Sequence, residues 1–273
     1  MKRVVLGLEK LLANPSEYLC GSTLGLVVNQ TSLTCDGQFS IGQFHSNKSF
    51  KLKALLAPEH GIYGVEQDMA LVADETDPLS GLSVQSLYGT DASSLAPSPT
   101  LLNGIDNLVF DIQDIGSRYY TFIYTLANCM KTCAISNTRM IVCDRPNPIN
   151  GVAVEGNLVK KKFQSFVGQY PIPNRHGMTV GELAVLFNEY FGIKCDLKVI
   201  PMEGWERSMW YDQTGLPWVS PSPNMPTLST ATVYPGMCLI EGTLLSEGRG
   251  TTLPFEQVGA PYINAETLAK TLN

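Results

Sequence analysis

The sequence predicts an α/β protein in which helices cover both faces of a mostly parallel sheet. Three observations support this fold class. Short apolar runs recur between residues 23 and 200, a segment with helical spacing separates two of them, and polar turn-forming residues follow most of the runs. Strands that are apolar throughout are buried on both faces, as in a parallel sheet between helix layers. With 273 residues, the chain can form one large unit or two interlocked lobes.

The first half of the chain supplies most of the expected elements. Residues 5–12 have apolar side chains at helical spacing, and Asn14-Pro15-Ser16 ends this helix. Residues 119–133 have the length and the apolar spacing of a crossover helix. The expected strands are residues 23–28, 53–57, 83–87, 107–111 and 139–143.

The second half of the chain differs in composition and has more loop-forming residues. After a loop-rich stretch, residues 179–190 are expected to form a helix, because Thr179 and Glu182 have the spacing of a capping box. A strand at residues 196–200 leads into a segment rich in Trp, Pro and Gly. We therefore expect a first domain of residues 1–150 and a second, auxiliary domain of residues 151–273.

Composition excludes several classes of function. The net charge of −6 and the pI near 5.1 argue against a nucleic-acid partner, which requires clustered basic residues. The one basic cluster, Lys160-Lys161-Lys162, is short and is expected to be a solvated turn. No apolar window has the length of a membrane span. The seven cysteines are scattered, without close pairs, and are expected to be free thiols in a reducing compartment.

The N-terminus resembles a signal peptide only superficially. Glu9 and Lys10 interrupt its apolar segment early, and no cleavage site of small residues follows. The sequence as it stands is therefore expected to be soluble and cytoplasmic.

Several catalytic motifs are absent. The sequence has no GxGxxG after its first strand, no GxxxxGK[ST], no HExxH and no GxSxG. These absences argue against dinucleotide oxidoreductases, P-loop NTPases, zincins and serine α/β-hydrolases. No cofactor is expected.

Carboxylates are the most prominent candidates for chemistry. Ligands of open parallel sheets bind beyond the carboxyl ends of the strands, and acidic residues gather at these expected ends: Glu59, Asp111, Asp114 and Asp144, with Glu155 and Glu247 in glycine-bounded loops. Glycoside cleavage uses such a pair of carboxyl groups. Glu59 follows an apolar segment, an environment in which a carboxyl group keeps its proton more readily. The alternative for each acid is a helix cap or a surface ion pair.

Other side chains offer weaker signals. His60 and His176 each precede a glycine, but nothing in their spacing requires a metal site, and none is expected. Arg118, Arg145 and Arg249 are suited either to hold an acidic group of a substrate or to form an internal bridge to an aspartate. Aromatic residues are candidates for stacking on sugars, although filling the core is their usual role: Tyr119, Tyr120, Trp205, Trp210, Trp218 and Tyr234.

Ordered sequence blocks resemble the exo-β-N-acetylmuramidases of the NamZ type. The resemblance runs from about residue 5 to the end of the chain. The blocks are Leu24-Gly-Leu-Val-Val-Asn-Gln-Thr31, Ala57-Pro-Glu-His-Gly61, Ser86-Leu-Tyr-Gly89, Phe110-Asp-Ile-Gln-Asp-Ile-Gly-Ser-Arg-Tyr-Tyr-Thr121, Asp144-Arg-Pro-Asn-Pro148, Val154-Glu-Gly156, His176-Gly-Met-Thr-Val-Gly-Glu-Leu183, Pro221-Ser-Pro-Asn-Met-Pro-Thr227, Glu241-Gly-Thr243 and Ser246-Glu-Gly-Arg-Gly-Thr251.

The resemblance implies an exo-acting glycoside hydrolase that releases N-acetylmuramic acid from the non-reducing end of peptidoglycan fragments. It also implies a Rossmann-like domain and a smaller α+β auxiliary domain, with the active site in the cleft between them. Glu59 is carried over as catalytic, and Asp114 is our choice for the second carboxylate, with Asp144 and Glu247 close behind. The expected substrate-binding residues are Asn29, His60, Arg118, Tyr120, Asp144, Glu155, His176, Asn224, Glu247 and Arg249.

The chain departs from the family pattern at its end. It stops at Asn273, shortly after the Pro254–Pro261 block, so the resemblance implies an incomplete auxiliary domain. Members often carry an export signal, which is not found here. Two other functions stay open: a catalytically inactive muropeptide-binding protein and a metal-assisted hydrolase that uses His60 and His176.

Overall fold

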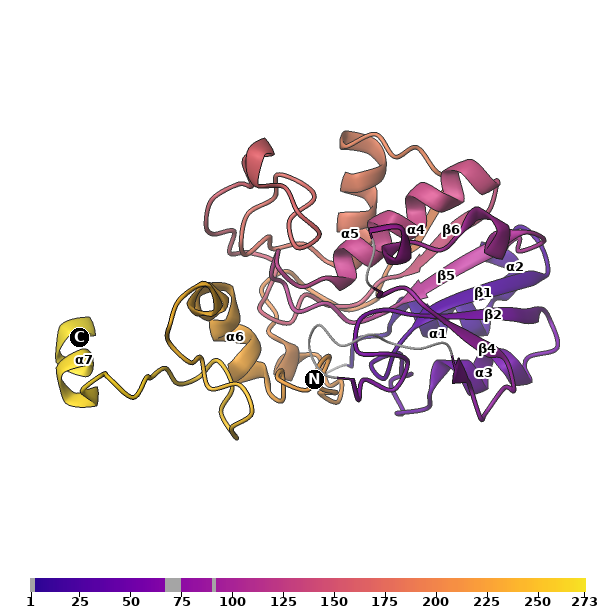
Figure 1. Cartoon of the computed structure of the whole chain (residues 1–273). Helices are drawn as coiled ribbons and strands as arrows, with labels where there is room; N and C mark the ends of the chain where they lie inside the picture. Colours follow the sequence, from indigo (N-terminus) through magenta and orange to yellow (C-terminus); the bar gives the residue numbers. More distant parts are fainter. Residues whose placement is uncertain (1–2, 67–74, 90–91) are drawn as a thin grey trace.

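A seven-stranded sheet forms the centre of the protein (Figure 1). The computed structural model describes residues 3–66, 75–89 and 92–273. Within them the sheet has the order β3-β4-β2-β1-β5-β6-β7. The strands are β1 (Thr23–Val28), β2 (Lys51–Ala57), β3 (Glu75–Thr76), β4 (Ser83–Ser86), β5 (Asn107–Asp111), β6 (Arg139–Cys143) and β7 (Leu197–Ile200).

All strands except β3 run parallel, and β3 pairs antiparallel with β4 at the edge. When the parallel strands are numbered along the chain, their spatial order is 3-2-1-4-5-6, the order of doubly wound dinucleotide-binding folds. The order reverses between β1 and β5. The prediction of a Rossmann-like, mostly parallel sheet is therefore confirmed.

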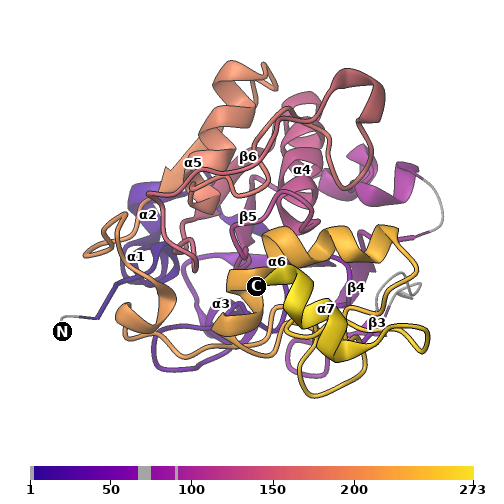
Figure 2. The ribbon, with the colours of Figure 1, turned by 90° about the vertical axis from the view of Figure 1, so that its left-hand side faces the viewer.

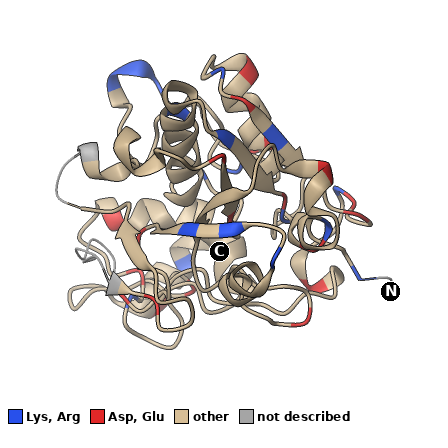
Figure 3. Ribbon diagram, turned by 90° about the vertical axis from the view of Figure 1, so that its right-hand side faces the viewer, with Lys and Arg blue, Asp and Glu red and all other residues tan. Residues whose placement is uncertain are grey.

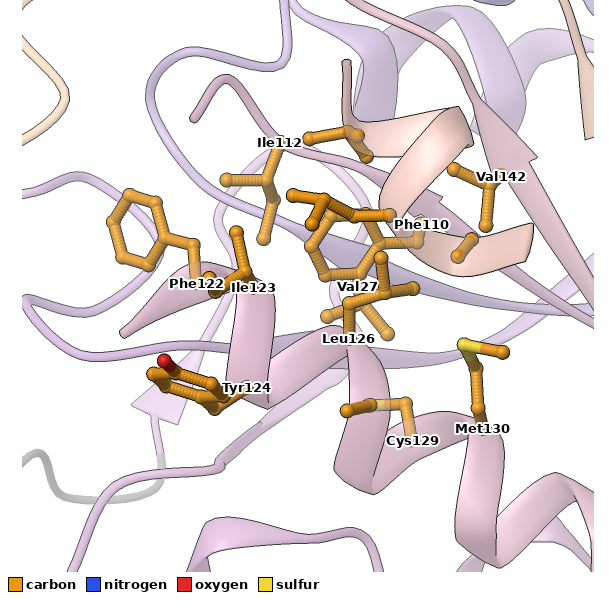
Figure 4. Close-up of a cluster of buried hydrophobic side chains, with 14 of the residues drawn as sticks. Val27, Phe110, Ile112, Phe122, Ile123, Tyr124, Leu126, Cys129, Met130 and Val142 are labelled. Atoms are coloured by element: carbon orange, nitrogen blue, oxygen red, sulfur yellow. The ribbon is translucent and has the colours of Figure 1, made fainter. Parts of the chain in front are cut away.

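Helices α4 (Phe122–Ser136) and α5 (Val180–Val185) cover one face of the sheet, and a π-helical turn, η4 (Leu186–Tyr190), extends α5. Val27, Phe110 and Val142 point from the strands toward Leu126 and Met130 of α4 (Figure 4). These side chains form the core of this layer.

The opposite face is covered by α1 (Gly7–Ala13), α2 (Pro15–Tyr18) and α3 (Ser40–Ser46). Leu26 and Val28 pack there with Leu8 of α1 and Phe44 of α3. Successive side chains of a strand point to opposite faces. Residues 24–28 of β1 are all apolar because both faces of the strand are buried there.

The expected elements correspond closely to the observed ones. The bounds of β1, β5 and β6 are those predicted. The predicted helix at residues 119–133 begins only at Phe122, because the residues before it form a turn in which the Tyr120 amide donates to the Ser117 carbonyl. The helix α3 was not predicted.

The sheet does not end at residue 150. Strand β7 pairs with β6, and α5 packs on both of these strands, so elements after residue 150 complete the sheet. The division expected near residue 150 thus does not coincide with an edge of the sheet, and as a boundary between functional lobes it stays a prediction.

The remaining helices are shorter or lie toward the C-terminus. They are η1 (Ala92–Leu95), η2 (Pro99–Leu102), η3 (Lys161–Phe163), η5 (Tyr211–Gln213), α6 (Leu228–Met237), η6 (Cys238–Gly242) and α7 (Ala265–Leu272). Helices α6 and α7 lie in front of the sheet in Figure 2, and α7 stands away from the rest of the molecule in Figure 1. Among the helices of the described ranges, none is both long and apolar enough to cross a membrane.

Candidate active site

A cavity of about 270 Å³ lies beyond the end of β2. Glu59 and His60 reach it from the turn after β2, and residues 119–122 reach it from the turn that begins α4. The opposite wall is built from the C-terminal segments, with side chains from residues 222–225, α6, η6 and residues 249–255. The cavity therefore lies between the sheet and the C-terminal part of the chain.

The backbone turns sharply at Glu59. Strand β2 ends at Ala57, and His60 adopts the left-handed conformation with φ of 73°, which is uncommon for a residue other than glycine. The His60 ring holds this turn, with Nδ1 2.8 Å from the carbonyl oxygen of Glu66. Glu59 itself is only 6% exposed. Its Oε2 accepts a hydrogen bond of 2.7 Å from the Thr121 hydroxyl at the start of α4.

Four aromatic rings in edge-on contact line the cavity. Tyr120 meets Phe122 at a centroid distance of 4.9 Å and Tyr234 at 6.0 Å, and Tyr234 meets Phe255 at 4.8 Å. All four rings belong to the lining. Aromatic rings present flat apolar faces, which suit the faces of a sugar ring.

A charged cluster contributes to the lining of the cavity. Arg249 donates from Nη2 to Glu241 at 3.1 Å and from Nε to Glu247 at 3.0 Å. The side chains of Arg249 and Glu241 are 33% and 36% exposed, and both line the cavity. Glu241 was not among the predicted site residues. Its place in the Glu241-Gly-Thr243 block is the signal that could have identified it.

The structure brings part of the predicted set together. The cavity lining includes Glu59, His60, Tyr120, Asn224 and Arg249. The remaining predicted residues lie outside the lining: Asn29, Asp114, Arg118, Asp144, Glu155, His176 and Glu247. Of the aromatic candidates, the lining contains Tyr119, Tyr120 and Tyr234 but none of the tryptophans.

Asp114 and His176 form a buried pair away from the cavity. His176 Nε2 lies 3.2 Å from Asp114 Oδ2, and the two side chains are 0% and 5% exposed. The same Asp114 oxygen accepts a hydrogen bond from the amide of Gly116. His176 Nδ1 accepts from the Met178 amide. These contacts fix the loop between β5 and α4.

Asp144 caps the N-terminus of α5. Its carboxylate accepts hydrogen bonds from the Gly181 amide at 2.7 Å and from the Thr179 hydroxyl at 3.1 Å. Glycine is needed at position 181 because a Cβ there would lie 2.8 Å from the carboxyl carbon of Asp144. Burial raises the pKa of Asp144 to about 6, against the opposing effect of these donors.

Arg145 forms an internal bridge, one of the two roles considered for it. Its Nε and Nη2 donate to the two oxygens of Asp111 at 2.7 and 2.9 Å, and Nη2 also donates to the Leu33 carbonyl at 3.0 Å. The side chains of Arg145 and Asp111 are 3% and 0% exposed. This ion pair ties β5 and β6 to the loop after β1.

Two further predicted residues also have local partners. Glu155 is 65% exposed at its side chain and pairs with Arg175 at 2.8 Å. The side-chain oxygen of Asn29 accepts hydrogen bonds from the amide and the hydroxyl of Thr31. Both residues shape loops near the carboxyl edge of the sheet.

Neither metal-ligand clusters nor disulfides are found in the described ranges. No three His, Cys, Asp or Glu side chains converge there in a way that could hold a metal ion. All seven cysteines are free thiols.

Both parts of one family match this chain. Residues 24–229 match the family model described as exo-β-N-acetylmuramidase NamZ, N-terminal, and residues 232–273 match the corresponding C-terminal model. The peptidoglycan β-N-acetylmuramidase NamZ of Bacillus subtilis (strain 168) is 45% identical over 271 residues, which are 99% of this chain and 65% of that protein. The chain thus spans slightly less than two thirds of the length of this relative.

Two crystal structures of DUF1343 family proteins from Bacteroides fragilis have the same fold. One superposes with a TM-score of 0.90 at 40% identity, over 99% of this chain and 69% of that chain. The other has a TM-score of 0.82 at 33% identity, over 97% of this chain and 69% of that chain. The cavity takes residues from both matched regions, with Glu59 and Tyr120 in the first and Tyr234, Glu241 and Arg249 in the second.

Proposed function

The chain belongs to the NamZ family of exo-β-N-acetylmuramidases, and from this premise we propose that its cavity is a glycosidase active site with Glu59 as the general acid. The whole protein would release N-acetylmuramic acid from the non-reducing end of peptidoglycan fragments. The observation that carries the proposal is the setting of Glu59. Its carboxyl group is buried, is held by Thr121 and belongs to a cavity lined by aromatic rings.

In this proposal Glu59 protonates the glycosidic oxygen as the bond to the anomeric carbon breaks. Its contact with Thr121 Oγ1 fixes the orientation of the carboxyl group, and the aromatic rings hold the sugar. Water then adds to the anomeric carbon and gives up its proton to a carboxylate of the site, from which the proton of Glu59 is restored, so that the products are the free sugar and the shortened fragment. No cofactor is required for this reaction.

A second carboxylate would stabilise the positive charge that develops on the sugar or would activate water. Asp114, predicted for this role, lies in the buried pair with His176. Glu241 lines the cavity together with Glu59, and its partial exposure suits a group that handles water. We therefore propose Glu241 ahead of Asp114 for this role. Participation of the substrate's own acetamido group would make Glu59 sufficient.

The direct test is hydrolysis of a chromogenic β-N-acetylmuraminide beside the matching N-acetylglucosaminide. Glu59→Gln keeps an oxygen that accepts from Thr121 but cannot give up a proton. We expect kcat to fall by about 10²- to 10⁴-fold, the usual contribution of a general acid. Equal turnover by the two proteins would remove Glu59 from the mechanism, and cleavage of the glucosaminide alone would refute the substrate.

The same assay compares the two candidates for the second carboxylate. We expect Glu241→Gln to lower kcat, whereas Asp114→Asn should act mainly on stability, because Asp114 is buried away from the cavity. If Asp114→Asn lowers kcat and Glu241→Gln does not, Asp114 is again the candidate for the second carboxylate. Saturable binding of the muraminide without release by the unaltered protein would instead identify an inactive binding protein.

A further inference from the structure

A second cavity adjoins the first. Its volume is about 290 Å³, and its walls are Arg118, Tyr119 and the loop of residues 157–168. Tyr119 and Val167 line both cavities. The two cavities therefore share a wall at Tyr119 and Val167.

The second cavity contains a buried cation that forms no ion pair within the part of the chain that the structure describes. Arg118 is 6% exposed, and within residues 3–66, 75–89 and 92–273 its guanidinium donates to neutral oxygens: the carbonyls of Asn157 and Ile172 and the side chain of Asn157. Its Nε is buried without a partner. Among the described residues, no ion pair includes Arg118. A buried charge without an opposite charge is costly, so this geometry favours an anion in the adjoining space.

A second cation lies on the wall of this cavity. Lys160 belongs to its lining, and Lys161 and Lys162 follow it in the exposed turn η3. None of these lysines takes part in an ion pair with another described residue. Figure 3 shows this basic turn at the upper edge of the view. The chain as a whole carries a net charge of −6, so the cluster is a local reversal of sign.

The walls of the cavity are also partly apolar. Tyr119 and Phe163 both contribute to them, and Phe163 is 66% exposed. The Arg118 guanidinium lies 5.2 Å from the centre of the Tyr119 ring. The space thus combines two cations with aromatic surface, which fits an organic acid better than an inorganic ion.

We propose that this second cavity is a subsite for a carboxylate that the substrate carries beside its scissile bond, with Arg118 and Lys160 as the recognising groups. The inference rests on the proposed muramidase function. Two parts of the substrate can supply the carboxylate: the lactyl group of the sugar itself, or an acidic peptide attached to that group.

The test compares Lys160→Ala with Lys161→Ala, a matched control that removes the same charge from the next position, outside the cavity lining. The substrates are a chromogenic N-acetylmuraminide, its lactyl methyl ester, and a muraminide that carries an acidic dipeptide. For the anionic substrates we expect Lys160→Ala to raise KM by about threefold to tenfold with little change in kcat. Lys161→Ala should resemble the unaltered protein.

The substrates separate the two sources of the carboxylate. If Lys160→Ala raises KM for the simple muraminide but not for its methyl ester, the recognised group is the lactyl carboxylate. If Lys160→Ala raises KM only for the substrate that carries the dipeptide, the recognised group is a carboxylate of the peptide. Equal KM values for Lys160→Ala and Lys161→Ala on every substrate would overturn the subsite.

A binding experiment keeps the subsite separate from the activity. Calorimetry of N-acetylmuramic acid and of an N-acetylmuramyl dipeptide with Glu59→Gln, with and without Lys160→Glu, measures the subsite for both sources of the carboxylate even if no muraminide is cleaved. We expect the charge reversal to weaken binding by about tenfold and added salt to reduce the difference. Unchanged binding of both ligands would refute the subsite, whereas a loss of turnover without a loss of binding would count against the proposed function and not against the subsite.

Discussion

Replacing Arg145 by methionine tests whether this arginine is structural. The substitution removes two hydrogen bonds to Asp111, of 2.7 and 2.9 Å, and one to Leu33 of 3.0 Å. Burial raises the pKa of Asp111, and Arg145 counteracts this rise. Without its partner, the Asp111 carboxyl must be buried either charged or protonated. Breaking a buried pair in this way costs about 3–5 kcal/mol, a large part of the roughly 5–15 kcal/mol that stabilises a typical domain.

The assay is urea unfolding at pH 7, followed by circular dichroism. Arg139→Met, on the strand that precedes Arg145, is the matched control. The Arg139 and Asp196 side chains are 29% and 60% exposed, and such a pair contributes about 1 kcal/mol or less. Adding Asp111→Asn to Arg145→Met should recover part of the loss, since a neutral amide costs less to bury than a lone carboxylate. A free energy of unfolding for Arg145→Met within about 1 kcal/mol of the unaltered protein would refute the reasoning.

Two further predictions concern Thr121 and Asp144. Thr121→Val removes the hydrogen bond to Glu59 and should lower kcat by about tenfold with little change in KM. Thr121→Ser keeps the hydroxyl and should retain the kcat of the unaltered protein. An unchanged kcat for the valine variant would show that Thr121 does not position Glu59. The pKa of Asp144 is raised to about 6, so the folded state binds this proton more tightly than the unfolded chain does. The contribution of Asp144 to the free energy of unfolding therefore increases as the pH falls through 6 and is lost as the pH rises. Relative to Asp144→Asn, the unaltered protein should therefore gain roughly 1 kcal/mol in urea titrations between pH 7 and pH 5, and parallel curves for the two proteins would contradict the shift.

The sequence predicted the sheet well because its strands are buried on both faces. The apolar runs that became β1, β5 and β6 have sharp ends, since polar residues begin where each strand leaves the core. The family was confirmed by the models that match most of the chain. Local sequence thus contained most of the information for the scaffold.

The candidate site was harder to predict because a carboxylate at a strand end has several possible partners. Asp144 and Asp111 have the same sequence context as Glu59, yet one caps α5 and the other pairs with Arg145. The partner of each carboxylate depends on how α5 and β6 pack in three dimensions. The spacing of residues in the sequence does not reveal this packing. Glu241 reaches the cavity only because the C-terminal segments fold back over the end of β2.

The point where the strand order reverses, between β1 and β5, is where doubly wound proteins usually hold the phosphates of a nucleotide. Here the guanidinium of Arg145 contacts Asp111 at the end of β5 and the Leu33 carbonyl in the loop after β1, and the space left among Thr31, Gln113 and Arg145 is only about 10 Å³. The ion pair of Arg145 with Asp111 is thus part of the protein at the carboxyl edge of the sheet, where other doubly wound proteins bind a ligand. The cavity proposed for the substrate lies one strand away, at the end of β2, where the protein leaves about 270 Å³ of space.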